Sequence, residues 1–115
     1  MRYIRVDYKG NIWTVPDELL LKSIAEEQGN ILVVTGKYER SKVLFHELKD
    51  YAISGIFSEF NMEIGSLVNK IHIRSSLDKT HYSGMQLTCA YITRDADLDF
   101  VIAIMSRCKG YPNLL

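Results

Sequence analysis

Three basic or titratable side chains stand at alternate positions of one short segment, namely Lys70, His72 and Arg74. Alternate residues of a β-strand point to the same face of a sheet, so a strand here places all three opposite Ile71 and Ile73. Such a row can attract a phosphate or an acidic protein. A histidine adds pH dependence, because its unperturbed pKa is about 6.5. We predict that this strand face is the functional surface.

Two further segments could extend this face. The predicted turn at residues 76–84 carries a histidine and a tyrosine, and an N-terminal strand carries Tyr3 and Arg5 on one side. If the two strands are neighbours, the combined face suits base stacking plus charge, as on sheet-based RNA-binding modules. No RNP-like aromatic motif is present, and a solvated face or half of a protein interface is the simpler interpretation. The predicted binding residues are Lys70, His72, Arg74, His81, Tyr82 and Arg5.

The segment ILVVTGKYERS invites comparison with a phosphate-binding loop. The motif GxxxxGK[ST] requires a glycine where Ile31 stands and a serine or threonine where Tyr38 stands. The motif is therefore absent, although an anion could still meet the N-terminus of a following helix near Lys37. The default interpretation is a charged surface loop.

The candidate metal ligands do not complete a set. Asp95, Asp97 and Asp99 match the start of a calcium loop, but Phe100 and Arg107 replace its required glycine and glutamate. Helix capping explains these aspartates better.

The histidines give no fuller set of ligands. His46 and Asp50 share a helical face, and His72 and His81 lie on opposite arms of a predicted hairpin. Either pair is too few for a zinc site, which needs three or four ligands. We predict no metal and no cofactor.

The two cysteines lie in apolar stretches without a CxxC pair. A nucleophilic cysteine needs an oriented base nearby, but Cys89 shares a predicted inward face with Leu87 and Tyr91, whereas His72 faces outward. We therefore expect Cys89 and Cys108 to be reduced residues packed in the core. A small enzyme with a nonstandard site is kept as the least favoured class.

Composition supports a single globular domain over residues 1–115. Hydrophobic residues make up 47% of the chain, and 14 Lys and Arg residues balance 14 Asp and Glu residues. A nucleic-acid-binding protein usually has a basic excess, because phosphate contacts supply most of its affinity. The N-terminus alternates apolar and polar residues, unlike a signal peptide, and no apolar run approaches the length of a membrane span. A cytoplasmic location is expected.

Hydrophobic periodicity predicts an α+β fold with an antiparallel or mixed sheet of 4–6 strands and two or three helices packed on one face. Residues 2–8 and 12–15 form a hairpin around Gly10. Pro16 begins a helix with Leu20, Leu21, Ile24 and Ala25 buried, and Gly29 ends it. Residues 30–35 form an interior strand, and residues 67–93 form further strands. Residues 95–108 form a helix that covers the sheet through Leu98, Val101, Ile102 and Met105.

The segment after Gly36 is ambiguous. Ser41 could cap one helix to about Phe60, or residues 42–46 could form a strand; the helix is preferred. In the helix, the core side would carry Leu44, Leu48, Tyr51, Ala52 and Ile56. Apolar residues then cover more than one helical face between Val43 and Phe60. Burying that surplus predicts a homodimer.

These features favour a small non-enzymatic binding or regulatory protein that acts through a protein–protein surface. Small inhibitor, immunity and phage anti-defence proteins have a similar size and a similar lack of motifs. The alternative is a nucleotide- or RNA-binding module that uses the basic strand face. No membrane partner is expected.

Overall fold

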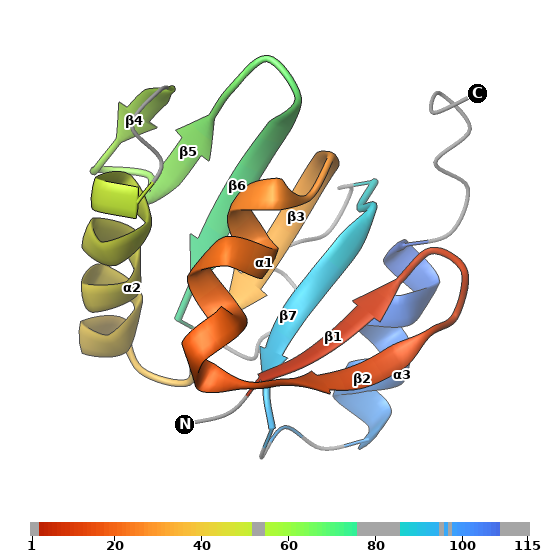
Figure 1. Cartoon of the computed structure of the whole chain (residues 1–115). Coiled ribbons are helices and arrows are strands. Elements are labelled where there is room, and N and C mark those ends of the chain that lie inside the picture. Colours follow the sequence, from red (N-terminus) through yellow and green to blue (C-terminus); the bar gives the residue numbers. More distant parts are fainter. Residues whose placement is uncertain (1–2, 52–54, 76–85, 95, 97, 109–115) are drawn as a thin grey trace.

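The computed structural model describes residues 3–51, 55–75, 86–94, 96 and 98–108. These residues form one mixed sheet of seven strands in the order β2-β1-β7-β3-β6-β5-β4 (Figure 1). The α+β prediction is confirmed, with more strands than the expected 4–6. The strands are β1 (Tyr3–Asp7), β2 (Ile12–Val15), β3 (Gly29–Val34), β4 (Ile56–Ser58), β5 (Glu63–Gly65), β6 (Asn69–Arg74) and β7 (Cys89–Thr93), and the helices are η1 (Asp17–Leu19), α1 (Leu20–Glu26), α2 (Tyr38–Tyr51) and α3 (Leu98–Arg107).

The centre of the sheet is parallel, and both edges are antiparallel hairpins. Strand β3 pairs in parallel with β6 and with β7. The β1–β2 hairpin joins β7, and the β4–β5 hairpin joins β6. The predicted β1–β2 hairpin is confirmed, and Gly10 in its turn has the positive φ of 85° that favours glycine.

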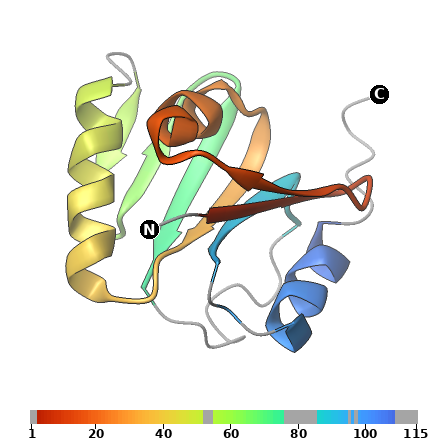
Figure 2. The same cartoon turned by 60° about the horizontal axis from the view of Figure 1, so that its bottom comes forward.

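The helices lie on both faces of the sheet (Figures 1 and 2). Helices α1 and α2 bury Leu20, Ile24, Leu44, Phe45 and Leu48 against one face. Helix α3 covers the other face and buries Phe100, Val101 and Ile104 with Leu32 and Val34 of β3. The prediction that all helices share one face is therefore wrong. Strand β3 is buried on both sides, which explains its continuous apolar run.

Two predictions about the helices are wrong in detail: which side of α3 is buried, and where α2 begins. Leu98 and Ile102 were predicted to face the sheet, but they are 70% and 53% exposed, whereas Val101 is buried. Both of these apolar residues belong to a second stripe on the same short helix, and packing on the sheet buries the stripe with Val101 and Ile104 instead. Ser41 does not cap α2, because the helix begins at Tyr38 and Ser41 lies within it, where its hydroxyl contacts Thr35 Oγ1 of the segment before the helix.

The strand alternative for residues 42–46 is wrong, and the preferred helix is correct only in its first part. Residues 42–51 are helical, as preferred, but α2 ends at Tyr51 and residues 56–58 form β4. Gly55 lies just before β4 at a positive φ of 150°, which is incompatible with a continued helix. Tyr51 and Ile56 are consequently exposed instead of buried. Ala52, also predicted to be buried, lies outside the described residues.

Candidate functional site

The predicted basic row on β6 carries a carboxylate at its centre. Strand β5 pairs with β6 so that Glu63 stands directly opposite His72. Glu63 Oε2 lies 3.0 Å from His72 Nδ1 and accepts a 3.0 Å hydrogen bond from Arg74. Lys70 Nζ lies 3.7 Å from Glu63 Oε1. The row is therefore a four-residue cluster in which one acid meets all three predicted binding groups.

The electrostatics of this cluster follow from its partial burial. Burial would raise the pKa of Glu63, but hydrogen bonds from Arg74 and His72 outweigh it and hold that pKa below its usual range. Burial lowers the pKa of His72 despite the opposing effect of Glu63. His72 is buried, so its imidazole is poorly placed to contact a ligand. The cluster has less free positive charge than the strand pattern alone indicates.

Arg5 belongs to a different part of the molecule. Strands β7 and β3 separate β1 from β6, so the two predicted faces do not join. Arg5 donates hydrogen bonds to Glu27 from Nε and Nη2. Its other terminal nitrogen, Nη1, donates to Asp7 Oδ2 at 3.1 Å. The guanidinium carbon also lies 4.6 Å from the centre of the Trp13 ring. Arg5 is thus held by two carboxylates and one aromatic ring.

Tyr91 and Ser23 extend this network into the interior between α1 and the sheet. Tyr91 donates a 2.5 Å hydrogen bond to Glu27 Oε2, and its hydroxyl also lies 2.5 Å from Ser23 Oγ. Burial would raise the pKa of Glu27, but the bonds from Arg5 and Tyr91 hold that pKa below its usual range. Burial and the bond to Glu27 both raise the pKa of Tyr91. These groups are mutually satisfied, so the network fastens α1 to β1 and β7.

Neither cysteine combines with these groups to make a reactive site. Cys89 and Cys108 are free and buried. Burial raises the pKa of the Cys89 thiol and raises that of Cys108 to about 12. A thiol held in its neutral form is a weak nucleophile. Both cysteines therefore act as packing residues.

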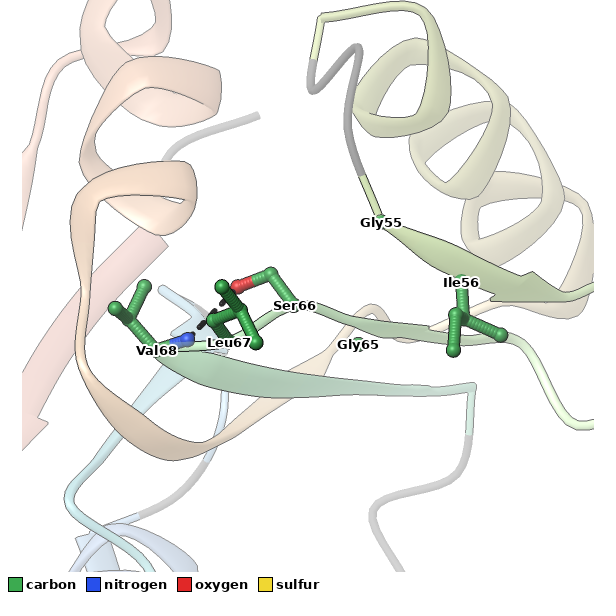
Figure 3. A pocket seen from close by; sticks show the side chains of 6 residues that line it. All are labelled: Gly55, Ile56, Gly65, Ser66, Leu67 and Val68. Atoms are coloured by element: carbon green, nitrogen blue, oxygen red, sulfur yellow. Dashed lines mark hydrogen bonds between the residues drawn. The ribbon is translucent and has the colours of Figure 1, made fainter.

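A third candidate lies at the β4 edge of the sheet, where apolar side chains are left open to solvent. A hollow of about 630 Å³ is lined by Gly55, Ile56, Gly65, Ser66, Leu67 and Val68 (Figure 3). Leu67 is fully exposed, and Ile56 is 82% exposed. Ser66 Oγ accepts hydrogen bonds from the backbone N–H groups of Val68 and Asn69, which fixes the turn that presents Leu67.

Two of the glycines that line this hollow, Gly55 and Gly65, lie close to each other. A Cβ atom at Gly55 would lie 2.8 Å from the carbonyl oxygen of Gly65, so only glycine fits at this position. Gly65 is the pairing partner of Ile56 and offers it no side chain to pack against. Ile56 is exposed as a consequence.

A second exposed apolar group stands at the other end of β4. Phe60, in the turn after β4, is 97% exposed. Its neighbour Glu59 has an oxygen 3.5 Å from His46 Nε2 of α2, and Lys49 Nζ of α2 lies 5.7 Å from the centre of the Phe57 ring. We call Ile56, Phe60, Leu67 and Val68 the edge surface.

The predicted site residues are thus only partly brought together. Lys70, His72 and Arg74 share one face, Arg5 lies apart from them, and His81 and Tyr82 lie outside the described residues. Sequence reasoning missed Glu63 and Glu27, because neither belongs to a motif. A signal for Glu63 existed in the short segment GSLV before Asn69, which is short enough to fold β5 back onto β6.

The chain matches no protein-family model, and no curated protein or solved structure is significantly similar to it. Within the described residues, no group of three or more His, Cys, Asp or Glu side chains is arranged to hold a metal ion. No helix in that part of the chain has the length and apolar character needed to cross a bilayer.

Proposed function

We propose that this chain is a small non-enzymatic binding or regulatory protein that acts through a protein–protein surface, and that the edge surface is its contact region. The observation that carries the proposal is the exposure of Ile56, Leu67 and Val68 around one hollow at the sheet edge, with Phe60 exposed at the other end of β4. Exposing large apolar side chains together costs free energy in water, so such patches mark interaction sites.

The position of these residues on a sheet edge strengthens the proposal. Strand β4 is the last strand in the sheet and pairs only with β5 among the described strands. An edge strand leaves backbone N–H and C=O groups available for another chain. Backbone pairing with apolar anchoring beside it is a common mode of protein recognition.

The basic strand face is the weaker candidate for contact. Glu63 compensates part of the charge of Lys70 and Arg74, and His72 is buried beside it. A phosphate would have to compete with this carboxylate for the same donors. The RNA- or nucleotide-binding alternative therefore gains no support from the arrangement.

The edge surface can be tested with a matched pair of leucine substitutions. Leu67→Asp alters the edge surface, whereas Leu98→Asp alters an exposed leucine of α3 that does not belong to this surface. Wild-type and variant proteins are immobilised and exposed to a lysate of the cells that make the protein, with and without nuclease treatment. We expect Leu67→Asp to lose the captured partner and Leu98→Asp to retain it.

Melting temperatures of the two variants check that both remain folded. Recovery of the same partner by Leu67→Asp, at the level of the wild type, would remove the edge surface from the proposal. Loss of the partner after nuclease treatment of the wild-type sample would instead favour the nucleic-acid class.

A further inference from the structure

A different hollow lies at the other edge of the sheet from the edge surface. Strands β2 and β4 are the outermost strands (Figure 1), and this hollow lies beside the β1–β2 hairpin. It measures about 410 Å³ and is bounded by the hairpin, by the residues at the end of α1 and by Thr88 before β7. We call it the hairpin hollow. Its volume lies within the range of sites for small ligands.

An aromatic platform forms one side of the hairpin hollow. Trp13 of β2 and Tyr8 of the hairpin turn both line it, and they are 47% and 36% exposed. Arg5, the register partner of Trp13 on β1, holds its guanidinium carbon 4.6 Å from the centre of the indole ring. Arg5 is fixed in turn by Glu27 and Asp7. The ring of Trp13 is therefore held in place from inside the protein while it remains half exposed.

Hydrogen-bonding groups surround this platform. The side chains of Asn11, Glu26 and Gln28 are exposed and line the hairpin hollow. Thr88 also lines it, and its hydroxyl is buried without a hydrogen-bond partner among the described residues. Such a hydroxyl is destabilising until a ligand or a water molecule supplies the missing partner. Carboxylates accept hydrogen bonds, and amides both donate and accept them, so this lining suits a ligand rich in hydroxyl groups.

The charges around the hairpin hollow disfavour a charged ligand. Three of the side chains that line it are carboxylates and two are basic, so an anion such as phosphate meets an excess of negative charge. A cation meets rings that already carry a cation of this chain. Arg5 lies over Trp13, and Lys9 Nζ lies 5.7 Å from the centre of the Tyr8 ring. A neutral ligand avoids both conflicts.

We propose that the hairpin hollow is a carbohydrate-binding site that takes a neutral sugar. The C–H groups on one face of a sugar ring pack against an exposed aromatic ring, whose π-face is electron-rich. Trp13 supplies that ring, and the sugar hydroxyls bond to the side chains of Glu26 and Gln28. Arg5 is a positioning residue, because it acts through Trp13. The site lies at the other edge of the sheet from the proposed protein contact, so it is a separate binding function.

Trp13 is the only tryptophan of the chain, so its fluorescence reports directly on this site. Three uncharged trisaccharides serve as probes, namely cellotriose, maltotriose and the trimer of N-acetylglucosamine. Each is titrated to millimolar concentrations against the full chain. We expect at least one of them to give a saturable change in the intensity or wavelength of the emission. The absence of a saturable change with all three overturns the proposal.

A matched pair of glutamine substitutions assigns the change to the hairpin hollow. Gln28→Ala removes a hydrogen-bonding group from its lining, whereas Gln86→Ala removes an exposed glutamine outside it. Because both side chains are exposed, both variants should keep the melting temperature of the wild type. We expect Gln28→Ala to raise the dissociation constant about fivefold, as the loss of one hydrogen bond does, and Gln86→Ala to leave it unchanged. Equal affinities of the two variants would place the sugar elsewhere and overturn the site.

Charged probes separate the other classes of ligand. Inorganic phosphate and tetramethylammonium chloride are titrated in the same way, with sodium chloride at equal ionic strength as the blank. We expect neither to change the emission of Trp13. A saturable response to either ion, together with none to the sugars, assigns the hairpin hollow to a charged ligand and overturns the proposal. Leu67→Asp, which alters only the edge surface, should bind the sugars as the wild type does.

Discussion

Glu27 joins Arg5 and Tyr91 in the polar network between α1 and the sheet. Its two oxygens accept the ε and η hydrogen bonds of Arg5 and the hydroxyl of Tyr91, and its side chain is only 13% exposed. Removing one partner of a buried ion pair leaves the other charge without compensation. The network is therefore more sensitive to the loss of Glu27 than a surface ion pair would be.

We predict that Glu27→Gln destabilises the protein at neutral pH by about 2–3 kcal/mol, somewhat less than a fully broken buried pair because Arg5 keeps Asp7. Urea unfolding measures the difference. Glu26→Gln is the matched control, since the neighbouring Glu26 is exposed and this change should have little effect. Equal stabilities for the two variants would show that the network contributes nothing to folding.

The same residue predicts a direction for the pH dependence of stability. The pKa of Glu27 is lower in the folded protein than in the unfolded chain, where it is about 4.3. Its contribution is therefore complete above about pH 4.3 and is lost as the pH falls through the folded pKa. Glu27→Gln should lose less stability on acidification than the wild type.

Among the helices, α3 shows how packing on the sheet decides which side of a short helix is buried. Helix α3 contains two overlapping apolar stripes, and only the stripe with Val101 and Ile104 is buried. Ile102 points to solvent although it follows Val101 directly. The adjacent pair makes a sensitive test of the orientation of the helix.

We predict that Val101→Asp destabilises the protein by several kcal/mol, because it buries a carboxylate without a partner. The same substitution at Ile102, which is 53% exposed, should have a small effect. Thermal unfolding of both variants measures the difference. A larger loss for Ile102→Asp than for Val101→Asp would mean that α3 presents its other stripe to the sheet.

For the whole molecule, the balance of 14 basic and 14 acidic residues leaves no net charge to steer a polyanion. A contact at the edge surface is mainly apolar. We therefore predict that partner binding changes little as the salt concentration rises, whereas phosphate-dominated binding falls steeply. The dissociation constant of the captured partner at low and high salt measures this.

A charge reversal at the strand face provides the control for that measurement. Lys70→Glu with Arg74→Glu should leave partner binding intact, because neither residue belongs to the edge surface. The melting temperature should fall, since Glu63 loses two cations and faces two added carboxylates. Loss of binding in this variant, together with a steep salt dependence, would return the functional site to the basic strand face.

Local patterns were sufficient to predict several elements of the fold. Alternation predicted β1 and β6, the turn glycine predicted the β1–β2 hairpin, and the continuous apolar run predicted β3 as an interior strand. These signals succeed because side-chain direction in a strand or turn is set by neighbouring residues in the chain. The candidate row Lys70, His72 and Arg74 was placed on one face for the same reason.

The remaining features required contacts between distant segments. Glu63 meets the basic row only because β5 pairs with β6, and Arg5 is separated from it only because β7 and β3 lie between β1 and β6. Helix α3 lies opposite α1 and α2, and the choice between its two apolar stripes was made by packing on the sheet. Strand order and helix side are set by burial over the whole chain, and a periodic pattern within one segment contains no information about which strand lies beside it.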